Sequence, residues 1–456
     1  MPNFIVSKLS FRPVWAHYLI AGDDVMKEYS HGVPIEIKRR KKKRRAIERH
    51  STAVAIIVLI VSMIVIGAAT VSISSPPEQQ EEQRAHISWT TEVVDSNGDV
   101  GQYCSLVLTG SDDPEIAYYN ATSGDLKIAG WTGSSWNLNS LPFADDVGSY
   151  VSQTRSSATT VKFACMYDAT NHDLIYVNSV GDYGVVDSSG DVGQYASIAV
   201  SSVTGALAIS YYNASSGDLK VAVNASGSGW VVKTVDSTDD VGLYTNIVFQ
   251  GANDTISVLY YDATNHSLKT AYQWGGTVPW FNMTMDEDPP LGDLGKWSSQ
   301  TTNGWDWYAS YYDQTNGALR VMYWTDLGAS SGLVVPDSVG DVGQYTSIGV
   351  NSTGRVFVSY YDNTSKDLKL AWNESTTWYN MTLDSTGNVG LYTSLKIDST
   401  DAIHISYYDL TNKDLKYVKV LQTEIPIPEF GDVVIPIVGL MAIMAVLSVR
   451  RNRKEK

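Results

Sequence analysis

The chain contains 456 residues and carries a formal net charge of −16 at pH 7. Lysine and arginine gather at 38–45 and 450–456, so the sequence between these two blocks is more acidic than the total indicates. A strongly acidic surface repels nucleic acid and anionic lipid, which excludes a nucleic-acid-binding role for this central part.

The N-terminal part predicts a membrane segment. Residues 1–50 end in the basic block and are expected to be cytoplasmic, and 51–74 follow as a helix. Within that helix the 21 residues from Ala53 to Ile73 carry no charge, which is enough to cross a bilayer. The basic block then directs the rest of the chain outward, through a linker at 75–86. The sequence leaves open whether the helix is retained as an anchor or cleaved as a signal peptide.

The central part repeats one unit seven times. Each unit holds an Asp-Val-Gly-x-Tyr loop or a close variant, which begins at Asp99, Asp146, Asp191, Asp240, Asp293, Asp341 and Asn388. Each unit also holds a Tyr-Asp or Tyr-Asn pair, which begins at Tyr119, Tyr167, Tyr212, Tyr261, Tyr312, Tyr361 and Tyr408. Successive pairs are separated by 45 to 51 residues. A period of this length with short strands is typical of a β-propeller with one blade per repeat.

The third repeat shows how a blade is built. Four β-rich runs, 197–200, 206–212, 219–223 and 230–235, are separated by clusters of Gly, Asn, Asp and Ser. This pattern predicts a four-stranded antiparallel sheet. Apolar and polar residues alternate poorly, as expected where neighbouring blades cover both faces of a sheet.

The two ends of the repeat region complement each other. The seventh copy lacks a fourth strand, whereas a spare strand of the right type, 89–94, precedes the first copy. Pairing this strand with the seventh blade would close the ring and leave no open edge. We therefore predict an all-β fold: a seven-bladed β-propeller of four-stranded antiparallel blades at 87–422, closed by the N-terminal strand and flanked by two transmembrane helices.

The C-terminus predicts a second membrane segment. A linker at 423–431 contains Pro428, Glu429 and Phe430, and is followed by an apolar run at 432–449 and a basic tail at 450–456. These three parts resemble the PEF-CTERM sorting signal of archaeal surface proteins. The resemblance implies a tail that an archaeosortase recognises and processes, and the alternative is an ordinary membrane anchor. Either arrangement places the propeller on the extracellular side of the cell membrane, with both termini cytoplasmic before processing.

The repeated loops predict a polar rim. The Asp-Val-Gly-x-Tyr loops and the Tyr-Asp pairs should emerge on one face and surround the central channel with carboxylates and tyrosines. Two segments, Asp95 to Asp99 and Asp187 to Asp191, loosely follow a calcium-loop pattern of alternating oxygen donors around a glycine. We expect no cofactor apart from calcium. The alternative is that Asp, Gly and Tyr recur because every blade needs them for its turns and its packing.

The fifth repeat departs most from the others and is the predicted ligand site. It carries Trp297 in place of Tyr, beside Asp293, with Trp305 and Trp307 nearby. Exposed tryptophans with neighbouring carboxylates suit a sugar, because the ring stacks on the sugar while the acids bind hydroxyl groups. The alternative is that these tryptophans pack between blades.

Two kinds of covalent modification are also predicted. The only cysteines, Cys104 and Cys165, fall in adjacent blades near one face, so they form either a disulfide or two buried thiols. Ten Asn-x-Ser/Thr sequons are plausible glycan acceptors in an exported protein. They begin at Asn120, Asn213, Asn224, Asn253, Asn265, Asn282, Asn351, Asn363, Asn373 and Asn380.

No catalytic set stands out in the repeats. Their layout resembles that of BNR/sialidase-like propellers, but the Asp-box is not found, and the arginines are limited to Arg155, Arg320 and Arg355. The histidines are isolated from one another. We therefore expect a non-enzymatic surface module that binds a glycan, a protein or a cation in the cell envelope. The alternatives are an envelope polysaccharide hydrolase or lyase, and a purely structural surface protein.

Overall fold

The computed structural model describes residues 86–423, apart from 142, 157–160, 226–228, 252, 277, 289–291, 305 and 327–328. Within this described part, no helix is long and apolar enough to cross a bilayer. The predicted membrane segments at 51–74 and 432–449, the linkers beside them and the Pro428-Glu429-Phe430 motif lie outside the described residues.

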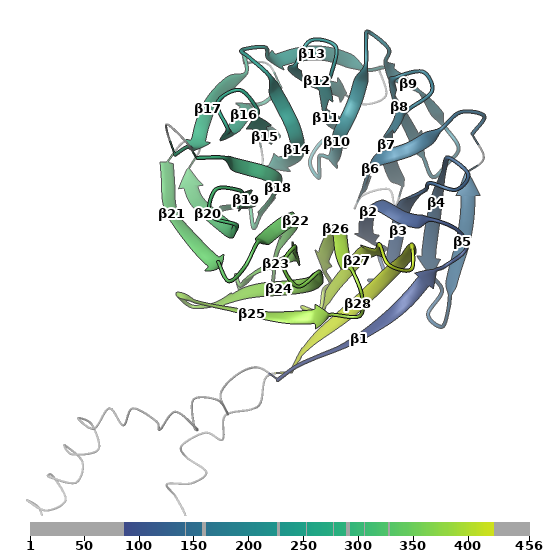
Figure 1. Ribbon diagram of the computed structural model, residues 1–456. Helices are drawn as coiled ribbons and strands as arrows, with labels where there is room; N and C mark the ends of the chain where they lie inside the picture. Colours follow the sequence, from purple (N-terminus) through teal and green to yellow (C-terminus); the bar gives the residue numbers. More distant parts are fainter. Residues whose placement is uncertain are drawn as a thin grey trace, which may run out of the picture. The chain divides into compact units, whose positions relative to one another are not determined.

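The described residues form seven four-stranded antiparallel sheets, arranged as blades around a central axis (Figure 1). Blades 1 and 2 contain β2 (Val100–Leu108), β3 (Pro114–Asn120), β4 (Asp125–Trp131) and β5 (Trp136–Leu141), then β6 (Val147–Arg155), β7 (Lys162–Asp168), β8 (Asp173–Asn178) and β9 (Tyr183–Asp187). Blades 3 and 4 contain β10 (Val192–Val200), β11 (Leu207–Asn213), β12 (Asp218–Asn224) and β13 (Val231–Asp236), then β14 (Val241–Gln250), β15 (Thr255–Asp262), β16 (Ser267–Gln273) and β17 (Phe281–Asp286). Blades 5 and 6 contain β18 (Leu294–Thr302), β19 (Trp307–Asp313), β20 (Ala318–Asp326) and β21 (Ala329–Asp337), then β22 (Val342–Val350), β23 (Val356–Asp362), β24 (Asp367–Glu374) and β25 (Thr377–Asp384). Blade 7 contains β26 (Val389–Ile397), β27 (Ile403–Asp409), β28 (Asp414–Thr423) and β1 (His86–Asp95).

The predicted closure of the ring is confirmed. Strand β1 pairs antiparallel with β28, in a register that runs from His86 opposite Thr423 to Glu92 opposite Tyr417. The Trp89 indole N–H also donates a 2.8 Å hydrogen bond to the Leu383 carbonyl of blade 6. The first strand of the described chain therefore completes the last blade, and no sheet is left one strand short.

The Asp-Val-Gly-x-Tyr motif differs from the predicted loop, because its Val, Gly and Tyr belong to the innermost strand. In blade 3 the ladder between β10 and β11 shifts register on both sides of Gln194, so the motif is a bulged strand start. The motif glycine is required by a close approach between blades. A Cβ on Gly101, which has φ of 107°, would lie 2.8 Å from Leu415 Cα in blade 7. This contact fixes the inner strand of one blade against the third strand of its neighbour.

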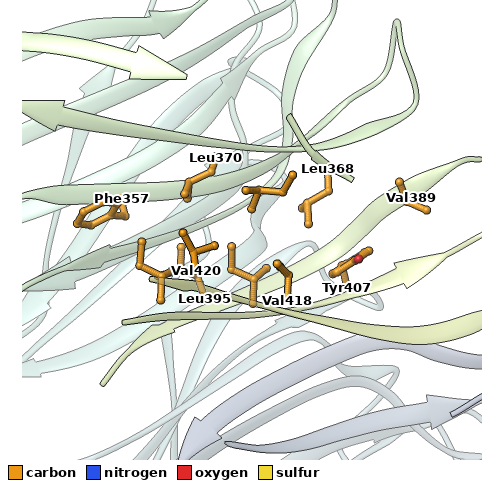
Figure 2. Packing of buried hydrophobic residues seen from close by; sticks show 11 residues of the cluster. Phe357, Leu368, Leu370, Val389, Leu395, Tyr407, Val418 and Val420 are labelled. Carbon is orange, nitrogen blue, oxygen red and sulfur yellow. The ribbon is translucent and has the colours of Figure 1, made fainter. Parts of the chain in front are cut away.

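The hydrophobic core is divided among the interfaces between blades. Between blades 6 and 7, Phe357, Leu368 and Leu370 pack against Leu395, Val418 and Val420 (Figure 2). Strands β15 and β23 are buried along their whole length, since both faces of each blade are covered. This explains why the sequence showed so little alternation. Burial of apolar side chains at every interface stabilises the ring by roughly 25 cal/mol per Å².

Candidate functional site

A closed ring of seven aromatic side chains surrounds the axis. Its members are the last residues of the seven motifs: Tyr103, Tyr150, Tyr195, Tyr244, Trp297, Tyr345 and Tyr392. Neighbouring ring centroids are 4.7 to 5.3 Å apart around the whole circle. All seven residues have positive φ of 49° to 54°, which turns each side chain towards the axis. Together with the residue that follows each of them, they line an axial cavity of about 210 Å³.

A second ring of contacts joins the blades at the same rim. The tyrosine of each Tyr-Asp or Tyr-Asn pair donates a hydrogen bond of 2.5 to 2.9 Å to the first residue of the next motif. Tyr408 completes the circle by donating to Asp99 of blade 1. The acids and tyrosines do gather on one face, and each hydroxyl connects two blades. These contacts support the structural alternative for the repeated motif.

A third set of contacts is buried between blades and was not expected from the sequence. At the interface of blades 7 and 1, Asp95 at the end of β1 accepts hydrogen bonds from the Tyr118 hydroxyl and the Lys127 ammonium. We call this an acid–tyrosine–cation cluster. Six interfaces between described blades contain one, and the other five are Asp187–Tyr211–Lys220, Asp236–Tyr260–Lys269, Asp286–Tyr311–Arg320, Asp337–Tyr360–Lys369 and Asp384–Tyr407–Lys416.

In four of the clusters the contacts lower the pKa of the carboxylate. Burial alone would raise the pKa of Asp187, but hydrogen bonds from Lys220, Ser189 and Tyr211 outweigh it and lower the pKa to about 2. The pKa of Asp95 is lowered in the same way by Lys127 and Tyr118. The pKa of Tyr211 is raised, first by burial and then by its bond to the carboxylate. Each cluster is thus a carboxylate held by one cation and one neutral hydroxyl.

The predicted calcium loops are occupied by these protein contacts. Asp95 and Asp187 contact lysine in the clusters, whereas Asp99 accepts hydrogen bonds from Tyr408 and Gln102 at the rim. Asp191 similarly accepts from Tyr167. Within the described part of the chain, no three His, Cys, Asp or Glu side chains are grouped to hold a metal ion. Calcium binding stays a prediction, and its expected ligands are divided between two different networks.

The tryptophans of the fifth blade do not form one site. Trp297 lines the axial cavity, and Asp293 beside it accepts hydrogen bonds from Tyr261 and Lys296. Trp307 is only 1% exposed and stacks on Trp324, so its expected contact with a ligand is wrong. Trp305 lies outside the described residues. The sequence could not separate an axial tryptophan from a core tryptophan, because both lie in strands with the same residue types.

Of the two alternatives for Cys104 and Cys165, the structure shows the buried thiols and not the disulfide. Both cysteines are free and buried. Cys104 packs at the interface with blade 7 and contacts the Tyr392 carbonyl, whereas Cys165 packs against blade 3. The two side chains therefore face opposite sides of neighbouring blades. Burial raises the pKa of Cys104 to about 12, which keeps this thiol neutral and unreactive.

The ten sequons differ in how accessible their asparagines are. Asn120, Asn213 and Asn351 are less than 10% exposed, and each side-chain oxygen accepts a backbone N–H in its own turn. In the folded protein these three side chains are therefore buried, and glycosylation of all ten sequons stays a prediction. Those with exposed side chains are Asn253, Asn265 and Asn380, and those with partly exposed side chains are Asn224, Asn282, Asn363 and Asn373.

One buried network resembles catalytic machinery. His404 lies between Asp398, 3.0 Å from its Nε2, and Tyr417, 2.6 Å from its Nδ1. The histidine is only 1% exposed, and burial lowers its pKa. A group so enclosed cannot contact a substrate, so this network stabilises blade 7.

A second hollow lies at the interface of blades 1 and 2. This inter-blade cleft has a volume of about 470 Å³, within the range of small-molecule sites. Ile128 and Leu141 line it from blade 1, and Phe163, Val177 and Tyr183 line it from blade 2. The same interface is the one without an acid–tyrosine–cation cluster. The repeat is therefore broken between blades 1 and 2 as well as in the fifth blade.

Comparisons with known proteins give likenesses of fold only. No family model and no curated protein matches the sequence. Among solved structures, a mutant of AofleA from Arthrobotrys oligospora is 12% identical, with a TM-score of 0.46 over 66% of this chain and 91% of its own. YCF48 from Cyanidioschyzon merolae is 10% identical, with a TM-score of 0.47 over 72% and 98%. The NanB sialidase from Streptococcus pneumoniae is 11% identical, with a TM-score of 0.41 over 74% and 70%.

Proposed function

We propose that this protein is a non-enzymatic binding module, tethered to the cell membrane with its propeller outside, and that it binds its ligand in the inter-blade cleft. The observation that carries the proposal is the coincidence of a cavity of about 470 Å³ with the one interface between described blades that lacks an acid–tyrosine–cation cluster. Features shared by all blades are explained by the packing of the propeller, whereas a feature found at one interface is better explained by binding of a ligand.

The tether is supported by the two uncharged segments, 51–74 and 432–449, and by their basic flanks. The ends of the described chain favour it as well, because His86 and Thr423 are paired neighbours at the open end of one ladder. Two membrane segments could therefore hold the propeller from one corner. An archaeosortase acting on the C-terminal segment would be consistent with this arrangement.

The test is a binding screen of the full-length protein in detergent against a glycan array, envelope extracts and calcium. Binding that is lost in Tyr183→Ala but retained in Trp297→Ala would support the cleft, since Tyr183 is 74% exposed at its mouth. Loss in Trp297→Ala alone would move the site to the axial cavity. Release of product from an envelope polysaccharide would instead establish an enzyme and overturn the proposal.

A further inference from the structure

One position of the outer strands is a tryptophan in five blades, a serine (Ser330) in blade 5 and a glycine in blade 2. Trp89, Trp136 and Trp378 each pair with the fifth residue after the conserved leucine of the third strand. The ladders of blades 3 and 4 end one pair earlier, and continuing them by one residue places Trp230 and Trp280 at the same position. In blade 2 the ladder pairs Leu174 with Asp187 and Val177 with Tyr183. The fifth residue after Leu174 is Ser179, and continuing the hairpin from the Val177–Tyr183 pair places Gly181 opposite it.

The tryptophans fill the space towards the preceding blade. The Trp136 ring contacts Tyr417 of blade 7 edge-on, with centroids 5.2 Å apart. Trp230 contacts Tyr176 of blade 2 in the same way at 5.3 Å. Each of these indoles thus packs across an interface between blades. Gly181 offers no such side chain to blade 1.

The hairpin between β8 and β9 explains the missing tryptophan. It turns early, because the Asn178 N–H donates to the Asp182 carbonyl and the Gly181 N–H donates to the Asn178 carbonyl. Gly181 has φ of 97°, a conformation that a tryptophan would adopt only with strain. A Cβ built on it would meet nothing within 4 Å. Gly181 itself lines the inter-blade cleft, so the cavity lies where the other blades place an indole.

Three polar side chains of the cleft are already engaged by the protein. Gln153 donates to the carbonyls of Ser105 and Glu115, and Asn178 donates to Asp182. The Ser179 hydroxyl accepts the Lys162 N–H. A polyhydroxylated ligand would find few free partners here. The apolar wall, with Phe143 and Phe163 among its members, favours a flat ring.

One ion pair in the cleft adds specificity. The Lys162 ammonium contacts the Glu115 carboxylate, and both side chains belong to the lining. A carboxylate can accept a ring N–H, and an ammonium can lie over the face of an aromatic ring. An indole offers both features. The Lys162–Glu115 pair therefore suits an indole, which is the ring that a tryptophan places at this position in other blades.

We propose that the inter-blade cleft binds an indole ring, supplied either by a free small molecule or by a tryptophan of a partner polypeptide. The inference rests on the proposed function and narrows its ligand. The bound ring would complete the blade 1–blade 2 interface as Trp136 and Trp230 complete theirs. Binding would therefore also stabilise the propeller against unfolding.

The probe for this inference is 5-fluoroindole, titrated into the full-length protein in detergent and followed by ¹⁹F linewidth. A second arm uses N-acetyl-tryptophanamide in competition, and its success would favour a polypeptide source. We expect Val177→Trp, which fills the cleft from β8, to weaken binding at least tenfold. Tyr183→Ala should also weaken it, and it is expected to fold because its side chain is exposed. Val203→Trp, on an exposed turn of blade 3, is the matched control and should bind normally.

The inference is overturned if the folded protein does not broaden the probe signal, or if Tyr183→Ala and Val177→Trp both bind it as the wild type does. If a glycan binds in the screen above while 5-fluoroindole does not, the ligand class is wrong and the binding function stands. If neither binds and no envelope partner is found, both proposals fail.

Discussion

Two neighbouring interfaces of the propeller are filled by side chains of opposite character. The interface between blades 2 and 3 is charged, and the interface between blades 1 and 2 is apolar. Between blades 2 and 3, Asp187, Tyr211 and Lys220 form a buried charged cluster. Between blades 1 and 2, Leu141, Met166 and Ile175 occupy the corresponding positions and belong to one apolar core. All three positions of the cluster therefore carry apolar residues between blades 1 and 2. A buried ion pair can be exchanged for apolar residues at little cost, whereas removing one partner leaves a buried charge unpaired.

A smaller contact follows the same rule. Ser210 and Thr245 share a buried hydrogen bond of 2.8 Å between blades 3 and 4. The corresponding pairs are Ala117 with Val151 between blades 1 and 2, and Cys165 with Ala196 between blades 2 and 3. In these three pairs, hydroxyl faces hydroxyl and apolar group faces apolar group. Between blades 4 and 5 the rule does not hold, because Leu259 corresponds to Ser210 while Ser298, whose hydroxyl donates to the Tyr244 carbonyl, corresponds to Thr245.

The largest expected effect comes from breaking one cluster. Lys220→Ala leaves the Asp187 carboxylate buried without its cation, and should reduce the free energy of unfolding by about 3–5 kcal/mol. The measurement is equilibrium unfolding in urea. Lys233→Ala, at an exposed position of β13, is the control and should change stability by less than about 0.5 kcal/mol. A similar small loss in Lys220→Ala would contradict the assignment.

Acid should weaken the charged interface and leave the apolar one unchanged. The folded-state pKa of Asp187 is about 2, below the ordinary value of about 3.9, so the stability it provides is complete above pH 4 and is lost as the pH falls through 2. The stability advantage of the wild type over Asp187→Asn should therefore shrink by about 2 kcal/mol between pH 5 and pH 2. An advantage that stays constant over this range would show that the carboxylate is not held as described.

Replacing the whole cluster by the apolar residues found between blades 1 and 2 should change the free energy of unfolding far less than removing one member of the cluster. The triple change Asp187→Leu, Tyr211→Met and Lys220→Ile copies blades 1 and 2 into the next interface. We expect the free energy of unfolding to change by less than about 1.5 kcal/mol, because side-chain volume is nearly conserved and no charge is left buried. If the triple variant is as unstable as Lys220→Ala, the two solutions are not interchangeable.

The smallest effect concerns the rim hydrogen bonds. Tyr212→Phe removes the hydroxyl that donates to Asp240, and should cost about 1 kcal/mol. Tyr361 donates instead to the neutral side chain of Asn388, so Tyr361→Phe should cost less. Both variants can be compared by thermal unfolding. The reverse order would mean that the charge of the acceptor does not contribute at this exposed rim.

Much of the fold could be predicted from the sequence because it depends on period and pairing. The recurring Tyr-Asp pairs counted the blades, and the spare strand at 89–94 identified the closure. The polar rim also followed from strand direction. The clusters could not be foreseen, because Asp95, Tyr118 and Lys127 come from three strands of two blades, and only the three-dimensional packing brings them together.

The candidate site was missed for a related reason. A search for unusual residues points to the tryptophans around Trp297, yet the cleft is marked by an absence at Gly181. Its signal is present in the sequence as a spacing: Trp89, Trp136 and Trp230 each lie ten residues before the first residue of the next motif, and the same spacing before Asp191 reaches Gly181. A glycine in a turn is otherwise unremarkable.

Because His86 pairs with Thr423, the two ends of the described chain lie side by side. Since the first and last strands are neighbours, a short peptide could join these residues, and new termini could be opened in the turn between β23 and β24. Such a circular permutant would retain all seven sheets, but its fourth strands would each follow the third along the chain. Comparing the refolding rate of this permutant with that of the natural chain would show how much the pairing of β1 with β28 slows closure of the propeller.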